Sequence, residues 1–559
     1  MGRTEVADLI PRVERWIAHD PDTKTRAEIE GFLANNDVEE LLERFQLRLK
    51  FGTAGIRGAQ GGGPNRMNRV TIRRVAVGVA KYLEQGQTVI IGYDARVNSR
   101  IFAEDFSLVL SLFGINSKIF SSPVPTPVLA FSVRRLRSDL GVMITASHNP
   151  ATDNGCKIFL SDGAQLREPE DGIIDAHIVE ADFPPRIIEQ GKGKIERLGS
   201  ETWAAYCSDI SKSVPQLSDL LTIAYTPLHG VAWATVKEVF SLTGVSSVVV
   251  VPSQAQPDSD FPTTPFPNPE EKGSMDEVLE VANAIEADLV LANDPDGDRL
   301  AVGISTSAGN WRILTGDEIG VLLCNRMTQI TSGRNRKVVS TVVCSSLVGK
   351  IAVAAGVSHS QTLTGFKWII PEAYKDPAWT PIFAYEEALG YAVTDLVRDK
   401  DGISAALRFT EMVIDLKKKG MTVLDQLNKI SLEHGLHVTR SVGVRFEGIG
   451  AFDRAIRVVE SIRTKPPKYL AGLQTLEVND FDSVSNIGDL PPSGMTRLLL
   501  EDGVRILIRP SGTESVVKIY IEQVVVVDDE SRIEGERRRI QRKIDHIVGD
   551  LDTFFSEVN

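Results

Sequence analysis

The sequence is poor in cysteine, with four residues in 559, at positions 156, 207, 324 and 344. Their wide spacing matches neither a zinc finger nor a Cys-x-x-Cys pair, so no structural zinc site or redox pair is expected. Reduced thiols are the default for cysteines of a cytosolic protein. We therefore expect a cytoplasmic location and no disulfide framework.

Long apolar runs and an excess of basic charge are also missing. No run approaches the length of a membrane span, and the first residues, which include Glu5, lack the apolar core of a signal peptide. The chain has 62 basic against 75 acidic residues, a net charge of −13. This balance argues against a general role on nucleic acid or on a membrane surface. We expect small-molecule partners, neither nucleic acid nor membrane, and a monomer or homodimer.

Most of the chain alternates between helix and strand patterns. Segments 70–83 and 102–113 have helical spacing of apolar residues, and 88–93 has the apolar character of a buried strand. Such alternation is typical of α/β domains with helices on both faces of a sheet. Similar strands are expected at 221–225, 246–251, 287–291 and 338–343.

The two ends of the chain differ from the middle. Segments 6–17 and 27–45 are predicted to be helical. Near the C-terminus, strands are predicted over 438–446, 496–508 and 516–527, followed by a helix over 530–555, a pattern that favours an α+β domain with an antiparallel sheet. The length indicates about three to five domains. We predict an α/β protein with mixed sheets and four domains, at 1–213, 214–315, 316–434 and 435–559.

A serine loop follows the apolar run 140–144 and reads Thr-Ala-Ser-His-Asn-Pro over 145–150. In open α/β sheets, ligands bind beyond the carboxyl ends of the strands, where this loop would lie. Ser147 is a candidate nucleophile, and histidine is a common activator of serine. His148 is therefore a candidate catalytic residue, either as the activator of Ser147 or as a hydrogen-bond donor, although for the His-Asn pair taken alone we slightly favour a structural role.

An acidic loop places three carboxylates at alternate positions, Asp294, Asp296 and Asp298, with Gly297 permitting a tight turn. Mg²⁺ prefers oxygen ligands and is often completed by a substrate phosphate oxygen. An EF-hand would need a glutamate at the twelfth loop position, whereas here the apolar strand 300–304 follows. The alternative is an acidic surface turn, since turns favour Asp and Gly.

A third loop, at 509–515, contains arginine, two hydroxyls and glycine between two strands. These groups suit a phosphate dianion, and the candidate ligands are Arg509, Ser511, Gly512 and Thr513. The alternative is an ordinary hairpin with a polar tip.

Two further loops could recognise a sugar. Glu386 follows an apolar segment, and a carboxylate can accept hydrogen bonds from vicinal hydroxyls. Thr364, Gly365 and Lys367 add a hydroxyl, a flexible turn and a cation. The alternative for the Glu386 loop is the start of an amphipathic helix.

These loops, together with Phe-Gly-Thr-Ala-Gly-Ile-Arg-Gly at 51–58, resemble the α-D-phosphohexomutase superfamily of phosphoglucomutases and phosphomannomutases. They occur in the family's order and span nearly the whole chain. The stretches 266–271, 362–368, 386–388 and 399–402 resemble the branch that contains phosphoglucomutase-2, phosphopentomutase and glucose-1,6-bisphosphate synthase.

The resemblance implies three α/β domains and a smaller fourth domain around a central cleft. It implies phosphoserine at Ser147, Mg²⁺ on the three aspartates and a Ser147 phosphate oxygen, and glucose 1,6-bisphosphate as activator. It places Arg57 and Lys157 beside the phosphoserine, with Lys157 a candidate base, and we interpret Cys156 as part of the wall of the site. Arg299 is expected to contact the transferring phosphate, the loop at 509–513 the other phosphate, and Glu386, Thr364, Gly365, Lys367 and Lys400 the sugar phosphate.

The sequence departs from many hexose-specific relatives at Ala388, where serine or threonine is common. The lost hydroxyl removes a hydrogen bond worth about 1 kcal/mol. From the resemblance we predict a phosphoglucomutase, with mannose phosphates as candidate further substrates. Because of Ala388, a phosphopentomutase or a glucose-1,6-bisphosphate synthase is the alternative. A serine-dependent phosphomonoester hydrolase and an inactive sugar-phosphate sensor are weaker alternatives.

Overall fold

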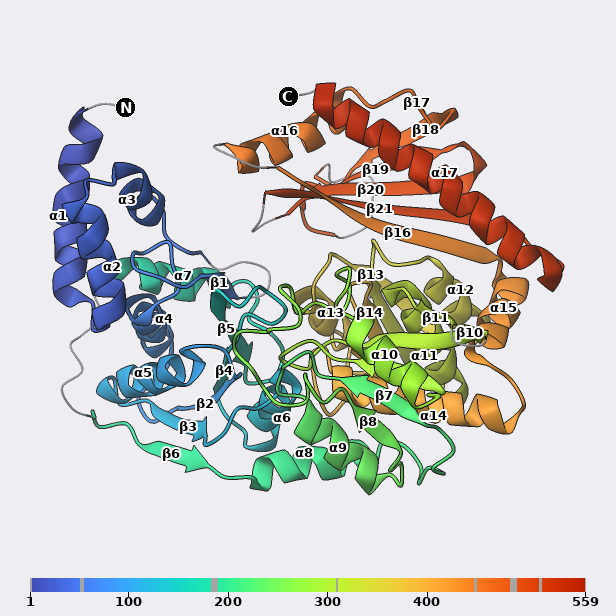
Figure 1. The fold of residues 1–559 in the computed structure, drawn as a ribbon, viewed down its shortest axis with the longest axis horizontal. Helices are drawn as coiled ribbons and strands as arrows, with labels where there is room; N and C mark the ends of the chain where they lie inside the picture. Colours follow the sequence, from blue (N-terminus) through green and yellow to red (C-terminus); the bar gives the residue numbers. More distant parts are fainter. Residues whose placement is uncertain are drawn as a thin grey trace. The chain divides into compact units, whose positions relative to one another are not determined.

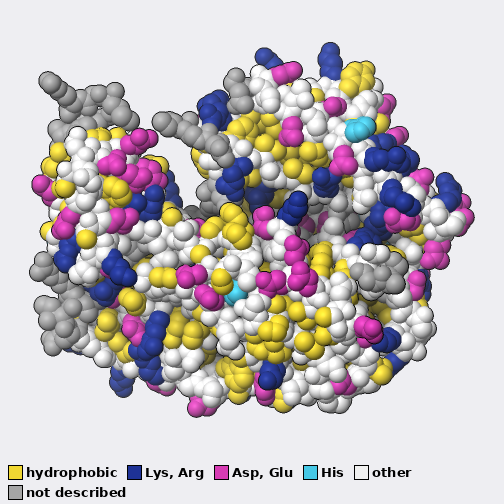
Figure 2. All heavy atoms as spheres, in the orientation of Figure 1, with side chains coloured by type: hydrophobic (Ala, Val, Ile, Leu, Met, Phe, Trp, Pro, Cys, Tyr) yellow, Lys and Arg dark blue, Asp and Glu magenta, His cyan; other side chains and the backbone are white. Residues whose placement is uncertain are grey.

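The structure is a computed structural model that describes residues 3–50, 55–181, 190–307, 310–446, 450–482, 490–511 and 515–557. The chain forms two compact units, described separately below: Met1–Leu314 with Gly390–Ile414, and Thr315–Leu389 with Asp415–Asn559. Within the described ranges, each helix is too short or too polar to cross a lipid bilayer. Acidic and basic side chains are interspersed over the face drawn in Figure 2.

The first unit begins with three helices, where the sequence predicted two. Asn36 adopts a left-handed conformation, φ 51°, and Asp37 accepts a hydrogen bond from the backbone N–H of Glu40. This cap starts a new helix, so the prediction of one helix over 27–45 was wrong. The helices are α1 (Arg3–His19), α2 (Thr23–Ala34) and α3 (Val38–Phe45).

The first sheet has the strand order β1-β5-β4-β2-β3-β6. Its strands are β1 (Ile56–Ala59), β2 (Thr88–Tyr93), β3 (Asn116–Phe120), β4 (Leu140–Ile144), β5 (Asp153–Leu160) and β6 (Ile195–Leu198). Strand β2 is parallel to β3 and β4, whereas β5 is antiparallel to β4 and β1. The sheet is therefore mixed.

Helices cover both faces of this sheet. They are α4 (Arg69–Tyr82), α5 (Ser99–Leu112), α6 (Thr126–Arg135) and α7 (Glu170–Glu180), and α8 (Glu201–Ser211) packs against α6 and α9 (Trp233–Leu242). Ile91 of β2 belongs to the apolar core shared with α4, α5 and α7, whereas the adjacent Gly92 faces Leu129 of α6. Alternate residues of a strand point to opposite faces, so this apolar strand needs cover on both sides.

The second sheet of this unit has the order β11-β10-β9-β7-β8. Its elements are β7 (Ile223–Thr226), α9 (Trp233–Leu242), β8 (Val248–Val250), α10 (Asp276–Ala284), β9 (Leu289–Ala292), β10 (Ala301–Ser307) and β11 (Asn310–Ile313). Strand β7 is parallel to β8 and β9, and β10 is antiparallel to β9. The unit also contains β15 (Gly390–Ala392) and the start of α14 (Gly402–Lys418).

The second unit opens with parallel strands. Strand β12 (Arg336–Thr341) pairs in parallel with β13 (Ser358–Thr362) on one side and β14 (Thr380–Glu386) on the other. Their carboxyl ends therefore meet at one edge. The accompanying helices are α11 (Gly316–Ile330), α12 (Leu347–Ala354), α13 (Phe366–Ala373) and α15 (Val423–His434).

The chain ends in an antiparallel sheet of order β16-β21-β20-β19-β18-β17, as predicted. Its strands are β16 (Leu436–Arg445), β17 (Tyr469–Leu470), β18 (Leu473–Asp480), β19 (Thr496–Leu500), β20 (Val504–Pro510) and β21 (Val516–Val525). The predicted single strand over 496–508 was wrong, because a turn at Glu501–Gly503 divides it and Asp502 has φ 57°.

Two helices, α16 (Ala451–Thr464) and α17 (Glu530–Glu557), pack on this last sheet. Figure 1 shows α17 running across the sheet. Its buried Ile540, Ile544 and Ile547 share an apolar core with Ile506 of β20. These sheets and helices confirm the predicted α/β fold class, and the predicted domain boundaries remain predictions.

Candidate active site

The serine loop lies at the carboxyl end of β4, as the sequence predicted. Ser147 is buried and has φ 55°, and its backbone N–H donates to Thr145 Oγ1 over 2.8 Å. Its hydroxyl donates to Asp294 Oδ2 over 2.9 Å, and Oγ lies 3.2 Å from His148 Nδ1. The fold thus brings Ser147 to a carboxylate 147 positions away in sequence.

Arg96, which the sequence reasoning missed, holds this loop in place. Its guanidinium donates to the carbonyl oxygens of Ser147 and Asn149, both over 2.6 Å, and of Pro150 over 2.7 Å. It also lies over the Phe261 ring, 4.9 Å from the centroid. A rigid planar donor suits several fixed carbonyls at once. The available signal was the position of Arg96, just beyond the carboxyl end of β2, which pairs in parallel with β4.

The acidic loop connects antiparallel β9 and β10, and Gly297 has φ 72°. Asp294, Asp296 and Asp298 are fully buried, and one oxygen from each lies within 4.8 Å of the others. The Oδ1 atoms of Asp296 and Asp298 are buried without a hydrogen-bond partner among the described residues. Buried carboxylate oxygens without donors are costly, and a hard divalent cation would satisfy them. The three side chains therefore fit a Mg²⁺ ion.

Lys157 neutralises part of this acidic loop. It lies on β5, 2 % exposed, and its Nζ donates to Asp296 Oδ2 over 2.6 Å and to Asp298 Oδ2 over 2.7 Å. Thr126, at the start of α6, also donates to Asp296 Oδ2 over 2.6 Å and was missed from sequence. Lys400 Nζ is 3.6 Å from Asp298 Oδ2, so this residue lies at the acidic loop.

The balance between burial and nearby positive charge shifts the pKa values of Asp294 and Asp298 in opposite directions. Burial tends to raise the pKa of Asp298, but Lys157, Lys400 and Arg299 outweigh it and hold that pKa well below its usual range. Burial, followed by the charges of Asp296 and Asp298, raises the pKa of Asp294 well above its usual range. The arrangement therefore keeps Asp298 ionised and makes Asp294 the carboxyl that most readily holds a proton.

Arg57 and Arg299, two further cations predicted for the site, lie close enough to His148 for their charges to act on it. Burial, followed by the charges of Arg299 and Arg57, lowers the pKa of His148 well below its usual range. His148 is therefore neutral, and its imidazole can exchange a proton with the Ser147 hydroxyl. The backbone N–H of Arg299 donates to Asp294 Oδ1 over 3.0 Å, which fixes the turn.

Cys156 does not line the site. It is completely buried in the apolar core of the first sheet, and burial raises the pKa of its thiol to about 12. Neighbouring residues of a strand face opposite sides, so Lys157 reaches the acidic loop and Cys156 points away from it. The expectation that Cys156 forms a wall of the site was wrong.

The predicted sugar loops lie in the second unit, at the shared edge of β13, β12 and β14. Glu386 ends β14 and is 9 % exposed, and Ala388 follows it. Gly365, with φ 110°, precedes α13, beside Thr364. Lys367 Nζ lies 5.1 Å from the Trp368 ring centroid. Parallel pairing therefore places both loops at one edge, where α/β sheets bind ligands.

Glu387 and Lys518 also belong to this region; the sequence analysis included Glu387 in the stretch 386–388 without assigning it a role and missed Lys518. Burial, followed by the charges of Glu386 and Asp317, raises the pKa of Glu387 to about 7, with Lys518 opposing the rise. Lys518 lies directly across the strand pair from Arg509. The Arg509 guanidinium donates to the Tyr520 hydroxyl over 3.4 Å. Ser511 ends the described part of the loop, and Gly512 and Thr513 lie outside the described residues.

Four family models match the chain in order. They are the phosphoglucomutase/phosphomannomutase alpha/beta/alpha domains I, II and III, over 48–185, 204–307 and 315–430, and the C-terminal domain, over 456–539. Fold and motifs thus define a chain of the phosphohexomutase class. The chain belongs to the phosphoglucomutase/phosphomannomutase family.

Individual relatives agree with this assignment. A phosphoglucomutase from Staphylococcus epidermidis is 33% identical over 529 residues, covering 90% of this chain and 95% of that protein. A Haemophilus influenzae protein named "Probable phosphomannomutase" is 33% identical over 472 residues, covering 82% and 93%.

Solved structures show the same fold. A phosphoglucomutase/phosphomannomutase family protein from Burkholderia thailandensis has a TM-score of 0.65 at 19% identity and covers 88% of this chain and 97% of its own. The open form of pp63/parafusin, a phosphoglucomutase from Paramecium, has a TM-score of 0.65 at 18% identity, covering 91% and 96%.

Proposed function

We propose that this protein interconverts α-D-glucose 1-phosphate and glucose 6-phosphate, with Ser147 carrying the phosphoryl group between two half-reactions. The observation that carries the proposal is the buried Ser147 hydroxyl, 2.9 Å from Asp294 and beside an acidic loop bound by Lys157. The relatives named phosphoglucomutase support the choice of glucose.

In the first half-reaction, the bond between phosphorus and Ser147 Oγ breaks, and a new bond forms to the free hydroxyl of the sugar phosphate. The product is a sugar bisphosphate, and Ser147 regains a proton as the sugar hydroxyl loses one. After the bisphosphate reverses its orientation in the site, the reverse step transfers its other phosphate to Ser147. Dividing a transfer into two covalent steps is a general route around a difficult direct reaction.

The residues have separable roles in this proposal. His148 is neutral and 3.2 Å from Ser147 Oγ, so it takes the serine proton as the phosphate arrives and returns it as the phosphate leaves. Lys157 donates to two carboxylates, a contact that suits charge balance better than proton abstraction. Arg57 and Arg299 supply positive charge beside the transferring group.

Mg²⁺ would be held by Asp294, Asp296, Asp298 and an oxygen of the Ser147 phosphate, where it supplies positive charge during the transfer. Glu386, Thr364, Gly365 and Lys367 hold the sugar phosphate, and the loop from Arg509 through Ser511, Gly512 and Thr513 holds its non-reacting phosphate. Lys400, 3.6 Å from Asp298, acts with the acidic loop. Glucose 1,6-bisphosphate would activate the enzyme by phosphorylating Ser147.

A second candidate activity rests on Ala388. This side chain offers no hydroxyl to a hexose, so ribose 1-phosphate or deoxyribose 1-phosphate is the alternative substrate, and a glucose-1,6-bisphosphate synthase is a further alternative. Comparing kcat/KM for glucose 1-phosphate, mannose 1-phosphate and ribose 1-phosphate separates these activities. A preference for ribose 1-phosphate would replace the glucose assignment.

The decisive variant is Ser147→Ala. We expect the purified protein to carry about one phosphate by intact-mass spectrometry, the variant to carry none, and mutase turnover to fall by more than about 10³-fold. Ser211→Ala, on α8, is the control and should keep both the phosphate and the activity.

Three outcomes would contradict the proposal. Appreciable mutase activity in Ser147→Ala would exclude the phosphoserine route. Release of inorganic phosphate from sugar phosphates without isomerisation would indicate a hydrolase. Binding of sugar phosphates by an unmodified protein without turnover would indicate a sensor.

A further inference from the structure

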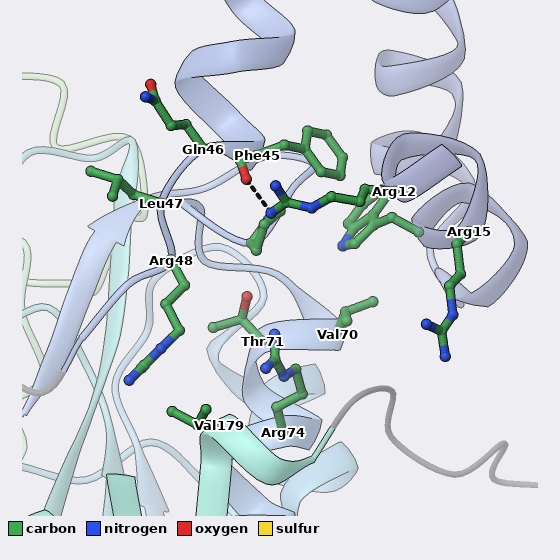
Figure 3. Close-up of a pocket in the computed structure, with 12 residues that line it drawn as sticks. Arg12, Arg15, Phe45, Gln46, Leu47, Arg48, Val70, Thr71, Arg74 and Val179 are labelled. Atoms are coloured by element: carbon green, nitrogen blue, oxygen red, sulfur yellow. Dashed lines mark hydrogen bonds between the residues drawn. The ribbon is translucent and has the colours of Figure 1, made fainter. Parts of the chain in front are cut away.

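A second pocket lies within the first unit, formed by the N-terminal helices together with α4 and α7. Its volume is about 480 Å³, within the range of small-molecule sites. Figure 3 shows side chains from α1, from the segment after α3, from α4 and from α7 lining one space. The lining residues are Arg12, Arg15, Trp16, Phe45, Gln46, Leu47, Arg48, Pro64, Val70, Thr71, Arg74 and Val179.

The charge of this pocket is one-sided. Among the described residues, its lining contains four arginines and no carboxylate, in a chain whose net charge is −13. Arg48 donates two hydrogen bonds, of 3.0 and 2.7 Å, to Asp175. Asp175 does not line the pocket. Arg12 donates over 2.6 Å to the carbonyl of Phe45, a neutral partner. Gathering like charges costs Coulomb energy, which an anionic ligand would offset.

A buried donor provides an independent observation. The Trp16 indole is 3 % exposed, lines the pocket, and its Nε1–H has no hydrogen-bond partner among the described residues. Buried tryptophan N–H groups usually find an acceptor. A phosphate oxygen in the pocket would provide one.

The apolar part of the lining defines the rest of the ligand. Leu47 is 65 % exposed and Val179 is 55 % exposed, both beside the arginines. A free inorganic anion would leave these side chains in water, whereas an organic phosphate would cover them. We propose that this pocket binds a small organic phosphate, with its phosphate on the arginines and Trp16 and its apolar portion on Leu47 and Val179.

Isothermal titration of the full-length protein with phenyl phosphate and with inorganic phosphate tests this proposal. Phenyl phosphate should bind more tightly than inorganic phosphate, because the two probes share a phosphate and differ in the apolar ring. The double variant Arg12→Gln/Arg15→Gln should weaken phenyl phosphate binding at one site by about 10-fold or more. Trp16→Phe, which keeps an aromatic ring and removes the N–H, should weaken it by about 5-fold.

The control Arg100→Gln/Arg197→Gln removes two arginines that pair with Glu104 outside the pocket. It should bind phenyl phosphate as the unmodified protein does. Far-ultraviolet circular dichroism and mutase activity, both unchanged in the double variant, show that the fold and the proposed active site persist. Three outcomes would overturn the proposal. The two double variants could bind phenyl phosphate equally well, or the two probes could bind with equal affinity. Alternatively, glucose 1-phosphate could displace phenyl phosphate from every site that binds it.

Discussion

Two acids, Asp298 and Glu387, behave in opposite ways in the two units. In the first unit, Asp298 lies beside Lys157, and the positive charge around it holds its pKa well below the usual range. In the second unit, Glu387 is surrounded by Glu386 and Asp317, and burial together with those charges raises its pKa to about 7. The residue type is similar, and the neighbouring charges decide the ionisation.

The difference matches what each region would have to bind. Ionised carboxylates with unpaired oxygens suit a metal ion and repel bare phosphate, so cations must accompany them. A glutamic acid that holds its proton near neutral pH can donate as well as accept hydrogen bonds, which suits a sugar hydroxyl. The first region is thus built around charge, and the second around hydrogen bonding.

The sharpest way to break this comparison is to remove the cation from the first unit. In Lys157→Met, Asp296 and Asp298 stay buried and both lose the Lys157 ammonium, although Lys400 remains 3.6 Å from Asp298. We expect the free energy of unfolding to fall by about 3 to 5 kcal/mol, the typical cost of breaking a buried ion pair. Urea denaturation at pH 7 measures it.

The stability lost in Lys157→Met should depend on pH, and the lowered pKa of Asp298 sets the direction of this dependence. A carboxylate whose folded pKa is lowered stabilises the fold above its ordinary pKa of 3.8, and this contribution is lost as pH falls further. The difference in free energy of unfolding between Lys157→Met and the unmodified protein should therefore become smaller below that pH. Mg²⁺ should stabilise the variant more than the unmodified protein. Lys118→Met, which breaks an exposed pair with Glu196, should cost about 0 to 1 kcal/mol. Equal losses in the two variants would remove the special role of Lys157.

Glu387→Gln tests the second unit. The folded pKa of about 7 lies above the ordinary 4.5, so the folded state binds the proton more tightly, and stability is lost as pH rises between these values. Between pH 4.5 and pH 8, the free energy of unfolding of the variant should therefore rise by on the order of 2 to 3 kcal/mol relative to that of the unmodified protein.

Thermal or urea unfolding at several pH values measures this change. The control is Glu460→Gln, which removes an exposed carboxylate from α16 and should show no such trend. A constant difference between Glu387→Gln and the unmodified protein at all pH values would show that Glu387 does not titrate in this range.

The sequence predicted the elements that depend on local pattern. The apolar run 88–93 is β2 with the same bounds, and the predicted helix 530–555 is α17. The prediction failed where a polar residue in a left-handed conformation divides an apolar pattern, as Asn36 does between α2 and α3 and Asp502 does between β19 and β20. The backbone dihedral angles of one residue do not change the spacing of the apolar residues around it. Hydrophobic periodicity therefore could not reveal these two breaks.

In the candidate site, residues within recognisable motifs could be predicted, and their long-range partners could not. Ser147 and the three aspartates stand in contiguous loops, so chemistry alone singled them out. Arg96 and Thr126 contact these loops only through tertiary packing, and each is an ordinary residue in its local sequence. Cys156 and Lys157 are neighbours in sequence and face opposite sides of β5, so proximity along the chain misplaced Cys156.

The smallest expected effect concerns substrate choice and would sharpen the second half of the comparison. Ala388 lies in a loop with a closely packed backbone, since a Cβ on Gly316 would come within 1.7 Å of the Glu387 carbonyl oxygen. Ala388→Ser would add a hydroxyl to this loop, and one hydrogen bond from it to a hexose would be worth about 1 kcal/mol.

We expect Ala388→Ser to raise the ratio of kcat/KM for glucose 1-phosphate over ribose 1-phosphate by about 5-fold, because about 1 kcal/mol corresponds to that factor. Ala388→Val is the matched control, since it adds volume without a hydroxyl and should not raise the ratio. A serine variant with an unchanged ratio would mean that this loop does not contact the hydroxyls that distinguish a hexose from a pentose. Specificity would then depend on Glu387, whose pKa of about 7 makes its hydrogen bonding depend on pH, and the ratio of kcat/KM values would differ between pH 6 and pH 8 although Ala388→Ser leaves it unchanged.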